Sequence, residues 1–363
     1  MSERLEIWVD ASVGETREAL VREGKPIALR VARASDEGRR ARWGELYCAR
    51  VREIDRRRRG AFLDLGLQEE QGFLPLGDDG RARIGRHRLA ITEGAGVVAA
   101  VTREAARGKN PVMELHETGH GDRPHRMARP ECDEELVLAK AGDAQIRARL
   151  DAAIEDALAR LAAIEGGGVL AIEPTSALVA IDVDAGGRPG SGDPERFALD
   201  LNIAAAFEAA RQIRLRNLGG LVAIDFVSMR AKAHLKQLED GVRAAFAGDP
   251  WSVQFGGLSR FGVYELSRAQ LRRPLHEQLR DADGRLSVET VALMALRAIE
   301  REARAMTGRQ IACTVAPDVK AWLDAGEIDW RAELSGRIGM RWSLDGAPNG
   351  AFWPRDKIDA RAL

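Results

Sequence analysis

Two short apolar runs, each ending near an aspartate, stand out in the hydrophobic pattern. Residues 177–184 are Ala-Leu-Val-Ala-Ile-Asp-Val-Asp, and residues 220–226 are Gly-Leu-Val-Ala-Ile-Asp-Phe. Runs of this length that are rich in β-branched residues are typical of buried strands. The amphipathic segment between them begins with Asp193 and a proline, a helix-start signal, and ends at Gly219. The pattern therefore predicts a strand–helix–strand unit.

This unit places Asp182 and Asp225 near the ends of two strands. If the strands are parallel neighbours joined by a right-handed crossover, both carboxylates emerge at the same edge of the sheet. The two carboxylates repel each other unless a cation lies between them. Mg²⁺ takes oxygen ligands, is held by one or two carboxylates, and can activate water at a phosphate. The alternative is that both aspartates only cap amides where loops begin.

Other apolar patterns predict further units. Residues 4–31 predict strands with a hairpin turn at 23–25, and the many short strands over residues 43–117 predict a small barrel. Residues 134–164 have helical periodicity, which predicts a pair of connecting helices packed on the sheet that carries the aspartates. The carboxyl end predicts a small α+β unit, with a helix from Ser287 to Met306, a strand at 311–315, a short helix at 317–322 and a last strand at 337–343.

The chain is long enough for several domains. Its 363 residues, 45% hydrophobic and 31% charged, fit a soluble globular protein with an α+β or α/β multidomain fold. We expect N-terminal strands at 1–40, the barrel at 41–118, a loop and connecting helices at 119–170, the sheet with the aspartates at 171–276 and the small α+β domain at 277–363.

The predicted barrel carries aromatic residues and clustered arginines. On a strand, Ala61 and Leu63 face one side, and Phe62 shares the other with Asp64. An aromatic ring on the solvated face can stack a base, which contributes about 1–3 kcal/mol. Phe73 is a candidate second platform, and basic residues crowd nearby: Arg56 to Arg59, Arg81, Arg83, Arg86, Arg88, Arg103, Arg107 and Lys109. Single-strand-binding OB folds use this combination. Alternatively, both rings only fill the barrel mouth and the arginines form a solvated hairpin tip.

Charge and cysteine content limit the kinds of binding site and structural framework that the chain can have. The net charge is −1, so binding of nucleic acid must rest on local basic patches. The three cysteines include no CxxC pair, which favours neither a disulfide framework nor a cysteine zinc site, and a reducing cytoplasm is the simplest compartment. No apolar run approaches the roughly 18 residues that span a bilayer. The residues His116, His120, His125 and Cys132 fit no zinc-ligand spacing, so we expect a loop without metal there.

Several of these stretches together resemble the ribonuclease E/G family. The similar segments in the aspartate unit are 173–184, 197–202 and 211–226; those that follow it are 258–262 and 265–268; and those in the barrel are 60–66 and 72–76. The resemblance implies cleavage of single-stranded, preferably A/U-rich RNA to 5′-phosphate and 3′-hydroxyl ends. It further implies a DNase I-like subdomain with Mg²⁺ (Mn²⁺ possible) on Asp182 and Asp225, and a reduced RNase H-like part. By the same resemblance, Phe62, Phe73 and Lys109 hold RNA in the OB fold, with Arg103, Arg107 and Arg260 as further RNA-binding residues.

The chain also departs from the family pattern. Asp184 stands where the family usually has Asn, which adds a third carboxylate to the expected catalytic residues. The segment between the barrel and Glu134 is too short for the family's sensor of 5′-monophosphate ends. The family's zinc-linking cysteine pair is missing, because residues 275–283 contain no cysteine. We therefore expect no zinc and no zinc-linked dimer, and the oligomeric state stays open.

Three functions follow from these patterns. The first is a compact Mg²⁺-dependent endoribonuclease without end sensing. The second is an RNA-binding protein whose cleavage site is impaired by Asp184. The third is a phosphodiesterase for a small nucleotide, which the barrel aromatics argue against.

Overall fold

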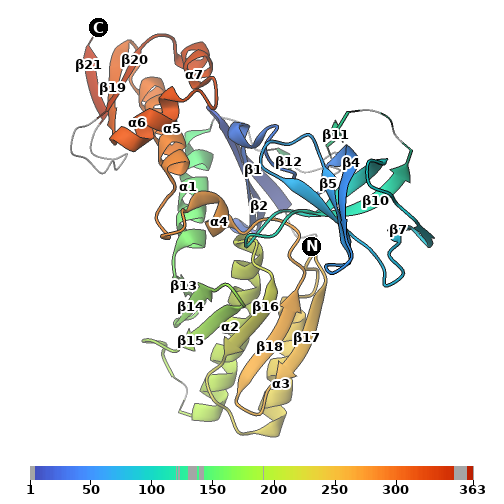
Figure 1. Cartoon of the computed structure of the whole chain (residues 1–363). Coiled ribbons are helices and arrows are strands. Elements are labelled where there is room, and N and C mark those ends of the chain that lie inside the picture. Colours follow the sequence, from blue (N-terminus) through green and yellow to red (C-terminus); the bar gives the residue numbers. More distant parts are fainter. Residues whose placement is uncertain are drawn as a thin grey trace.

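The computed structural model describes residues 5–119, 121, 123–129, 137–138, 143–190, 192–346 and 358–362. The chain has a mixed α+β architecture in which a mixed sheet and a carboxyl-terminal unit lie at opposite ends (Figure 1). An amino-terminal sheet and a barrel lie between these two ends.

The amino-terminal sheet is built from the strands expected there. β1 (Leu5–Ser12), β2 (Glu15–Arg22) and β3 (Lys25–Arg33) are antiparallel, and β12 (Val137–Leu138) pairs with β1 in parallel. A short 3₁₀ turn, η1 (Ala34–Asp36), follows β3. Trp8, Ala19 and Val21 of the sheet share a core with residues of the helix α1 (Ala144–Leu158).

The prediction of two connecting helices over residues 134–164 is wrong. Among the described residues of this segment, α1 is the one helix, and it packs on the amino-terminal sheet rather than on the sheet with the aspartates. Residues Leu161–Ala163 form β13, in which Leu161 is exposed while Ala162 is buried. This alternation with a period of two, rather than the helical period, continues to the buried Ile164 and fixes the segment as a strand.

The small barrel is confirmed as a closed five-strand barrel, consistent with an OB fold. β4 (Leu46–Asp55), β5 (Gly60–Asp64), β6 (Gln71–Pro75), β10 (Val112–Thr118) and β9 (Gly96–Arg103) pair in this order. β4 closes the barrel by pairing with β9, and β11 (His125–Ala128) extends β4. β7 (Ala82–Ile84) and β8 (His87–Leu89) form a separate hairpin.

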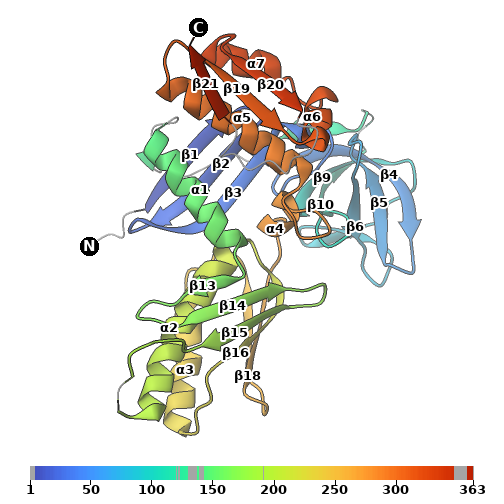
Figure 2. The ribbon, with the colours of Figure 1, turned by 90° about the vertical axis from the view of Figure 1, so that its left-hand side faces the viewer.

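The mixed sheet has the order β13-β14-β15-β16-β18-β17. Its further strands are β14 (Val169–Pro174), β15 (Val179–Asp184), β16 (Gly220–Asp225), β17 (Val253–Leu258) and β18 (Val263–Arg268). The helices α2 (Pro194–Leu215) and α3 (Lys232–Ala245) cover one face (Figure 2). Val179, Ile181 and Ile224 pack beneath them, so this face holds the core.

The carboxyl-terminal unit is α+β, as expected, and begins after α4 (Leu275–Leu279). Ser287 caps α5 (Val288–Ala305) by accepting from the Thr290 amide. The remaining elements are β19 (Arg309–Val315), α6 (Pro317–Asp324), α7 (Trp330–Ile338), β20 (Trp342–Gly346) and β21 (Ile358–Ala362).

The last strand, predicted at 337–343, begins later than predicted. Helix α7 precedes it, because Trp330, Leu334 and Ile338 are buried at a spacing of four and the Asp329 carboxylate accepts from the Ala332 amide. Only the end of the predicted strand overlaps β20. Within the described residues, no helix is long and apolar enough to cross a membrane.

Candidate active site

The strands β15 and β16 place two carboxylates side by side. They are parallel neighbours, as expected, and Asp182 lies opposite Asp225 in their register. Directly opposed residues on neighbouring strands, whose backbones lie about 5 Å apart, point to the same face. The alternation that buries Ile181 and Ile224 therefore turns both aspartates to the face away from α2 and α3, and both are exposed.

The surroundings of this aspartate pair are small and acidic. Ala171 lies opposite Asp182 on β14, and Ala223 precedes Asp225 by two positions on the same face of β16. Among the described residues, no hydrogen-bond donor or basic side chain contacts either carboxylate. Two neighbouring negative charges thus lack a cation within this part of the chain, which favours a positive ligand between them.

Asp184 lies on the same face, two positions after Asp182, and is exposed. Its Oδ1 accepts a hydrogen bond from the Gly186 amide at 2.8 Å. This turn uses one carboxylate oxygen and leaves the other available. Asp184 therefore has a structural contact of its own and still adds negative charge to the face.

The residues present fit a hydrated Mg²⁺ rather than an enclosed metal. Carboxylate oxygens are the ligands that Mg²⁺ prefers, and it keeps several waters where only one or two carboxylates bind it. No group of three or more His, Cys, Asp or Glu suited to a metal occurs in the described ranges. The aspartate pair, with water completing the coordination, is the ligand set that this face offers.

The loop after β16 is held by α2. The buried side chain of Asn202 donates to the Val227 carbonyl at 2.7 Å and accepts from the Val227 amide at 3.0 Å. Glu195 accepts from the Arg230 amide at 2.9 Å, and this hydrogen bond lowers the pKa of its carboxyl. Together they fix the chain two to five residues beyond Asp225. Sequence reasoning missed Glu195, whose one signal is an acid in the first turn of a helix.

Arg260 is brought to the same edge of the sheet. It lies in the turn between β17 and β18, and β18 begins with Val263 opposite Asp225. Its guanidinium lies 4.7 Å from the ring centre of Phe261, which is 78% exposed. A cation and an exposed ring thus adjoin the aspartate pair.

The predicted stacking residues lie together in the barrel. Phe62 is opposite Phe73 on β5 and β6, with ring centres 5.6 Å apart in an edge-to-face arrangement. Both rings are half-buried, and the Arg58 guanidinium lies 5.7 Å from the Phe62 ring centre. A Cβ on Gly60 would lie only 2.2 Å from the Phe73 ring, so Phe73 covers the backbone there.

Arg103 and Arg107 lie at the joint between barrel and mixed sheet instead. The Arg107 amide donates to Glu277 at 2.9 Å, and its Nη2 donates to the Gly219 carbonyl at 3.2 Å, beside the amino end of β16. Burial lowers the pKa of Arg103. Lys109 is exposed in a turn. Arg107 therefore adjoins the opposite end of the strands from Asp225.

The histidines and cysteines give no metal site in the described residues. His125 bonds through Nδ1 to the Arg123 carbonyl at 2.8 Å, whereas His120 and Cys132 lie outside the described residues. Cys48 and Cys313 are buried. The expectation that zinc plays no part stays a prediction.

Comparison with known proteins gives matches that all carry the name ribonuclease E or ribonuclease G. Residues 123–271 match the model of the Ribonuclease E/G family. Ribonuclease E of Haemophilus influenzae is 35% identical over 213 residues, which cover 56% of this chain and 22% of that protein. Ribonuclease E of Escherichia coli is 35% identical over 182 residues, covering 48% and 17%. Ribonuclease G of Haemophilus influenzae is 29% identical over 202 residues, covering 53% and 41%.

The matched segment contains both members of the aspartate pair and the helix between them. The chain spans less than half the length of each of these three relatives. On the family match and the agreement among these relatives, the chain is similar to the ribonuclease E/G family over the segment that carries the aspartate pair.

Proposed function

We propose that this chain is a Mg²⁺-dependent endoribonuclease that cleaves single-stranded, A/U-rich RNA during RNA processing or decay. The observation that carries the proposal is the pairing of Asp182 with Asp225, exposed and without a basic partner among the described residues. The relatives are named ribonucleases, which supports the same class of reaction here. The mixed sheet would correspond to the family's DNase I-like subdomain, and the amino-terminal sheet with α1 to a reduced RNase H-like part.

Each group on this edge has a role in the proposal. Asp182 and Asp225 hold the metal, which when bound activates water and stabilises negative charge at a phosphate. Asn202 and Glu195 keep the loop after Asp225 in place through its backbone. Arg260 attracts the RNA phosphates to the edge. The products would carry 5′-phosphate and 3′-hydroxyl ends.

The barrel would hold the RNA beside this edge. Phe62, half-buried and next to the Arg58 guanidinium, offers a ring face for a base. Stacking of one base contributes about 1–3 kcal/mol. Phe62→Ala should therefore weaken binding of a single-stranded oligonucleotide about tenfold. A chain that acts only on small nucleotides would lose no activity in this variant.

The proposal is tested by cleavage of an unstructured A/U-rich oligonucleotide with and without Mg²⁺. Asp182→Asn and Asp225→Asn should each slow cleavage on the order of a hundredfold or more, because a lost ligand costs at least as much as a lost supporting contact. Asp240→Asn, an exposed acid on α3, is the matched control and should cleave at the normal rate. Equal cleavage by Asp182→Asn and the unaltered chain would refute the proposal.

The proposed lack of sensing of 5′-monophosphate ends is tested by comparing two RNA substrates. Substrates with a 5′-monophosphate and with a 5′-hydroxyl should be cleaved at similar rates. A strong preference for the monophosphate would contradict this part of the proposal.

The second candidate is an RNA-binding protein of the same family with impaired cleavage. The third carboxylate, Asp184, favours it, because the added charge can misplace a metal-bound water. Intact RNA binding, together with cleavage activity that disappears on repurification, would support this candidate over the enzyme.

A further inference from the structure

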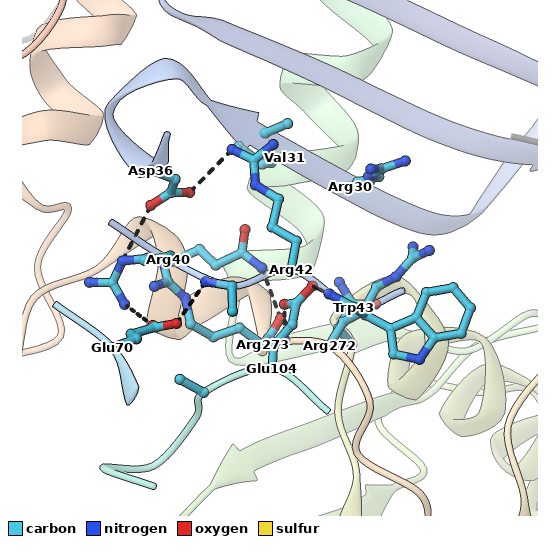
Figure 3. Close-up of a pocket in the computed structure, with 15 residues that line it drawn as sticks. Arg30, Val31, Asp36, Arg40, Arg42, Trp43, Glu70, Glu104, Arg272 and Arg273 are labelled. Carbon is cyan, nitrogen blue, oxygen red and sulfur yellow. Dashed lines mark hydrogen bonds and ion pairs between the residues drawn. The ribbon is translucent and has the colours of Figure 1, made fainter. Parts of the chain in front are cut away.

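A pocket lies where the amino-terminal sheet, the barrel and the mixed sheet meet (Figure 3). Its walls come from the end of β3, the connection before β4, the barrel residues Glu70 and Glu104, and Arg272 and Arg273 after β18. Its volume is about 110 Å³, well above the roughly 30 Å³ that one water occupies in the liquid. The pocket therefore has room for a tetrahedral anion.

The lining has an excess of positive charge. It contains five arginines (Arg30, Arg40, Arg42, Arg272 and Arg273) against three carboxylates (Asp36, Glu70 and Glu104).

Two of the three carboxylates, Glu70 and Glu104, accept hydrogen bonds from backbone amides. Glu104 accepts from the Trp43 amide at 3.0 Å and from the Arg273 amide at 2.8 Å. Glu70 accepts from the Ala41 amide at 2.8 Å and from Arg40 at 3.3 Å. These contacts, drawn as dashed lines in Figure 3, fix the walls of the pocket. The third carboxylate, Asp36, lies 3.3 Å from Arg40 and 3.9 Å from Arg42.

Arg273 is the clearest unsatisfied group. Its Nε is buried and has no hydrogen-bond partner among the described residues, although its own backbone amide is bonded to Glu104. Burial, followed by repulsion from Arg40, lowers the pKa of its guanidinium. A buried cationic donor without an acceptor is costly, so an acceptor that carries negative charge would stabilise it.

Two neighbouring features indicate that this acceptor belongs to a nucleic acid. The Arg272 guanidinium lies 5.3 Å from the ring centre of the half-buried Trp43, which gives a flat surface at the rim. Arg103, which directly precedes the wall residue Glu104, lies on the barrel strand that leads to the pocket. Arginine beside an aromatic ring is the combination that binds a phosphate together with its base.

We propose that this junction pocket binds a phosphodiester phosphate of single-stranded RNA through Arg273. Trp43 and Arg272 at its rim would contact the adjacent nucleotide. The RNA would thereby be held at the joint between barrel and mixed sheet, at the far end of β16 from Asp225. The inference rests on the proposed function only in taking RNA as the ligand, and it requires no cleavage.

The test measures binding of the whole chain to a single-stranded oligonucleotide by fluorescence anisotropy, in EDTA so that no cleavage occurs. Arg273→Gln should bind about tenfold more weakly, because a hydrogen bond to a charged group is lost. The slope of log affinity against log salt concentration should become shallower by about 0.7, the loss of one phosphate contact on a single strand. Arg301→Gln, an exposed arginine on α5, is the matched control and should change neither quantity.

Oligonucleotides with a 5′-hydroxyl and with a 5′-monophosphate distinguish the two possible sources of the phosphate. A backbone phosphate predicts the same loss of affinity on both. A loss confined to the monophosphate form would overturn the assignment to the backbone.

A second measurement needs no loss of Arg273. The ¹⁵N-labelled Nε–H resonance of Arg273, assigned by its disappearance in Arg273→Lys, should shift when the oligonucleotide is added to the unaltered chain. No shift at saturation, or unchanged affinity and salt slope in Arg273→Gln, would overturn the proposal. Failure of the endoribonuclease proposal would appear in the cleavage assay alone, and these binding results would stand.

Discussion

Asp184 carries a negative charge that changes the chemistry of the aspartate face. Its Oδ1 accepts from the Gly186 amide, a hydrogen bond that an asparagine oxygen can also accept. Asn at this position could donate as well, whereas a carboxylate only accepts. Asp184→Asn therefore keeps the turn and isolates the effect of the charge.

We expect Asp184→Asn to change kcat/KM for RNA cleavage by at most about tenfold, the low end of the roughly 10- to 100-fold cost of losing a supporting group, because asparagine keeps the contact with Gly186. The Mg²⁺ concentration for half-maximal activity should rise, because one negative charge is removed. Both quantities come from a Mg²⁺ titration of the cleavage rate. A gain of a hundredfold or more would instead favour the impaired-enzyme alternative.

The site residues that could be predicted are those with local signals. Asp182 and Asp225 end apolar runs on either side of a capped helix, and this unit fixes their common edge. Glu195 had no such signal, because its contact with the Arg230 amide joins residues 35 positions apart through the packing of α2. Strand alternation predicts Phe62 on the solvated face, and Phe73 is a candidate beside it, but whether these rings stack RNA depends on the ligand.

At the scale of elements, α2 positions the loop after β16 through Asn202. Its side chain satisfies both the amide and the carbonyl of Val227 and is fully buried. Without it, both backbone groups lose their partner in a partly buried setting. The effect should therefore appear in stability and in cleavage.

We expect Asn202→Ala to lower the free energy of unfolding by about 1–3 kcal/mol for each unsatisfied group. At temperatures where the variant is folded, cleavage should still fall roughly 10- to 100-fold, because the chain beyond Asp225 loses its support. Urea unfolding and cleavage rates measure the two effects. Arg196→Ala, exposed on the same helix, should change neither. A stability loss with full activity would contradict the positioning role.

The elements that could not be predicted lack a distinctive local pattern. Residues 161–163 follow a helix directly and contain only Leu and Ala, so their strand pairing with β14 depends on the sheet already formed. Helix α7 has buried residues at helical spacing, but it is too short for this spacing to stand out in the sequence. Strand β21, which pairs with β19, lies beyond 337–343, the last strand that the pattern predicts.

At the scale of the whole molecule, a buried charge cluster joins the amino-terminal sheet to α1 and α5. Asp10 accepts from Arg147 Nε at 3.0 Å and also pairs with Arg17. Arg147 lies 3.8 Å from the fully buried Glu300 of α5. Burial alone would raise the pKa of Asp10, but attraction and hydrogen bonds from Arg17 and Arg147 outweigh it and hold this pKa below its usual value.

The lowered pKa of Asp10 determines how the free energy of unfolding changes with pH. A carboxyl whose pKa is lower in the folded state stabilises the protein above its unfolded pKa of about 3.9 and loses that contribution as the pH falls through the folded value. We therefore expect the free energy of unfolding to decrease below about pH 4. Asp10→Asn should lower it by about 3 kcal/mol at neutral pH, because two buried guanidinium groups lose the negative charge that they share, although Arg17 keeps Asp151 and Arg147 keeps Glu300.

Urea unfolding between pH 3 and 7 measures both effects. The variant should show a weaker pH dependence than the unaltered chain in the acid range, and Asp240→Asn should match the unaltered chain. Equal stability of Asp10→Asn at neutral pH would show that the cluster does not depend on this carboxylate.

The central claim, a divalent ion shared by Asp182 and Asp225, is tested most directly by a crystal structure with Mn²⁺. The anomalous signal should place one ion at this edge of the mixed sheet, contacting oxygens of both carboxylates directly or through its own waters. The result would also show whether Asp184 faces the ion. No ion there at saturating Mn²⁺, with the two carboxylates turned apart, would contradict the account.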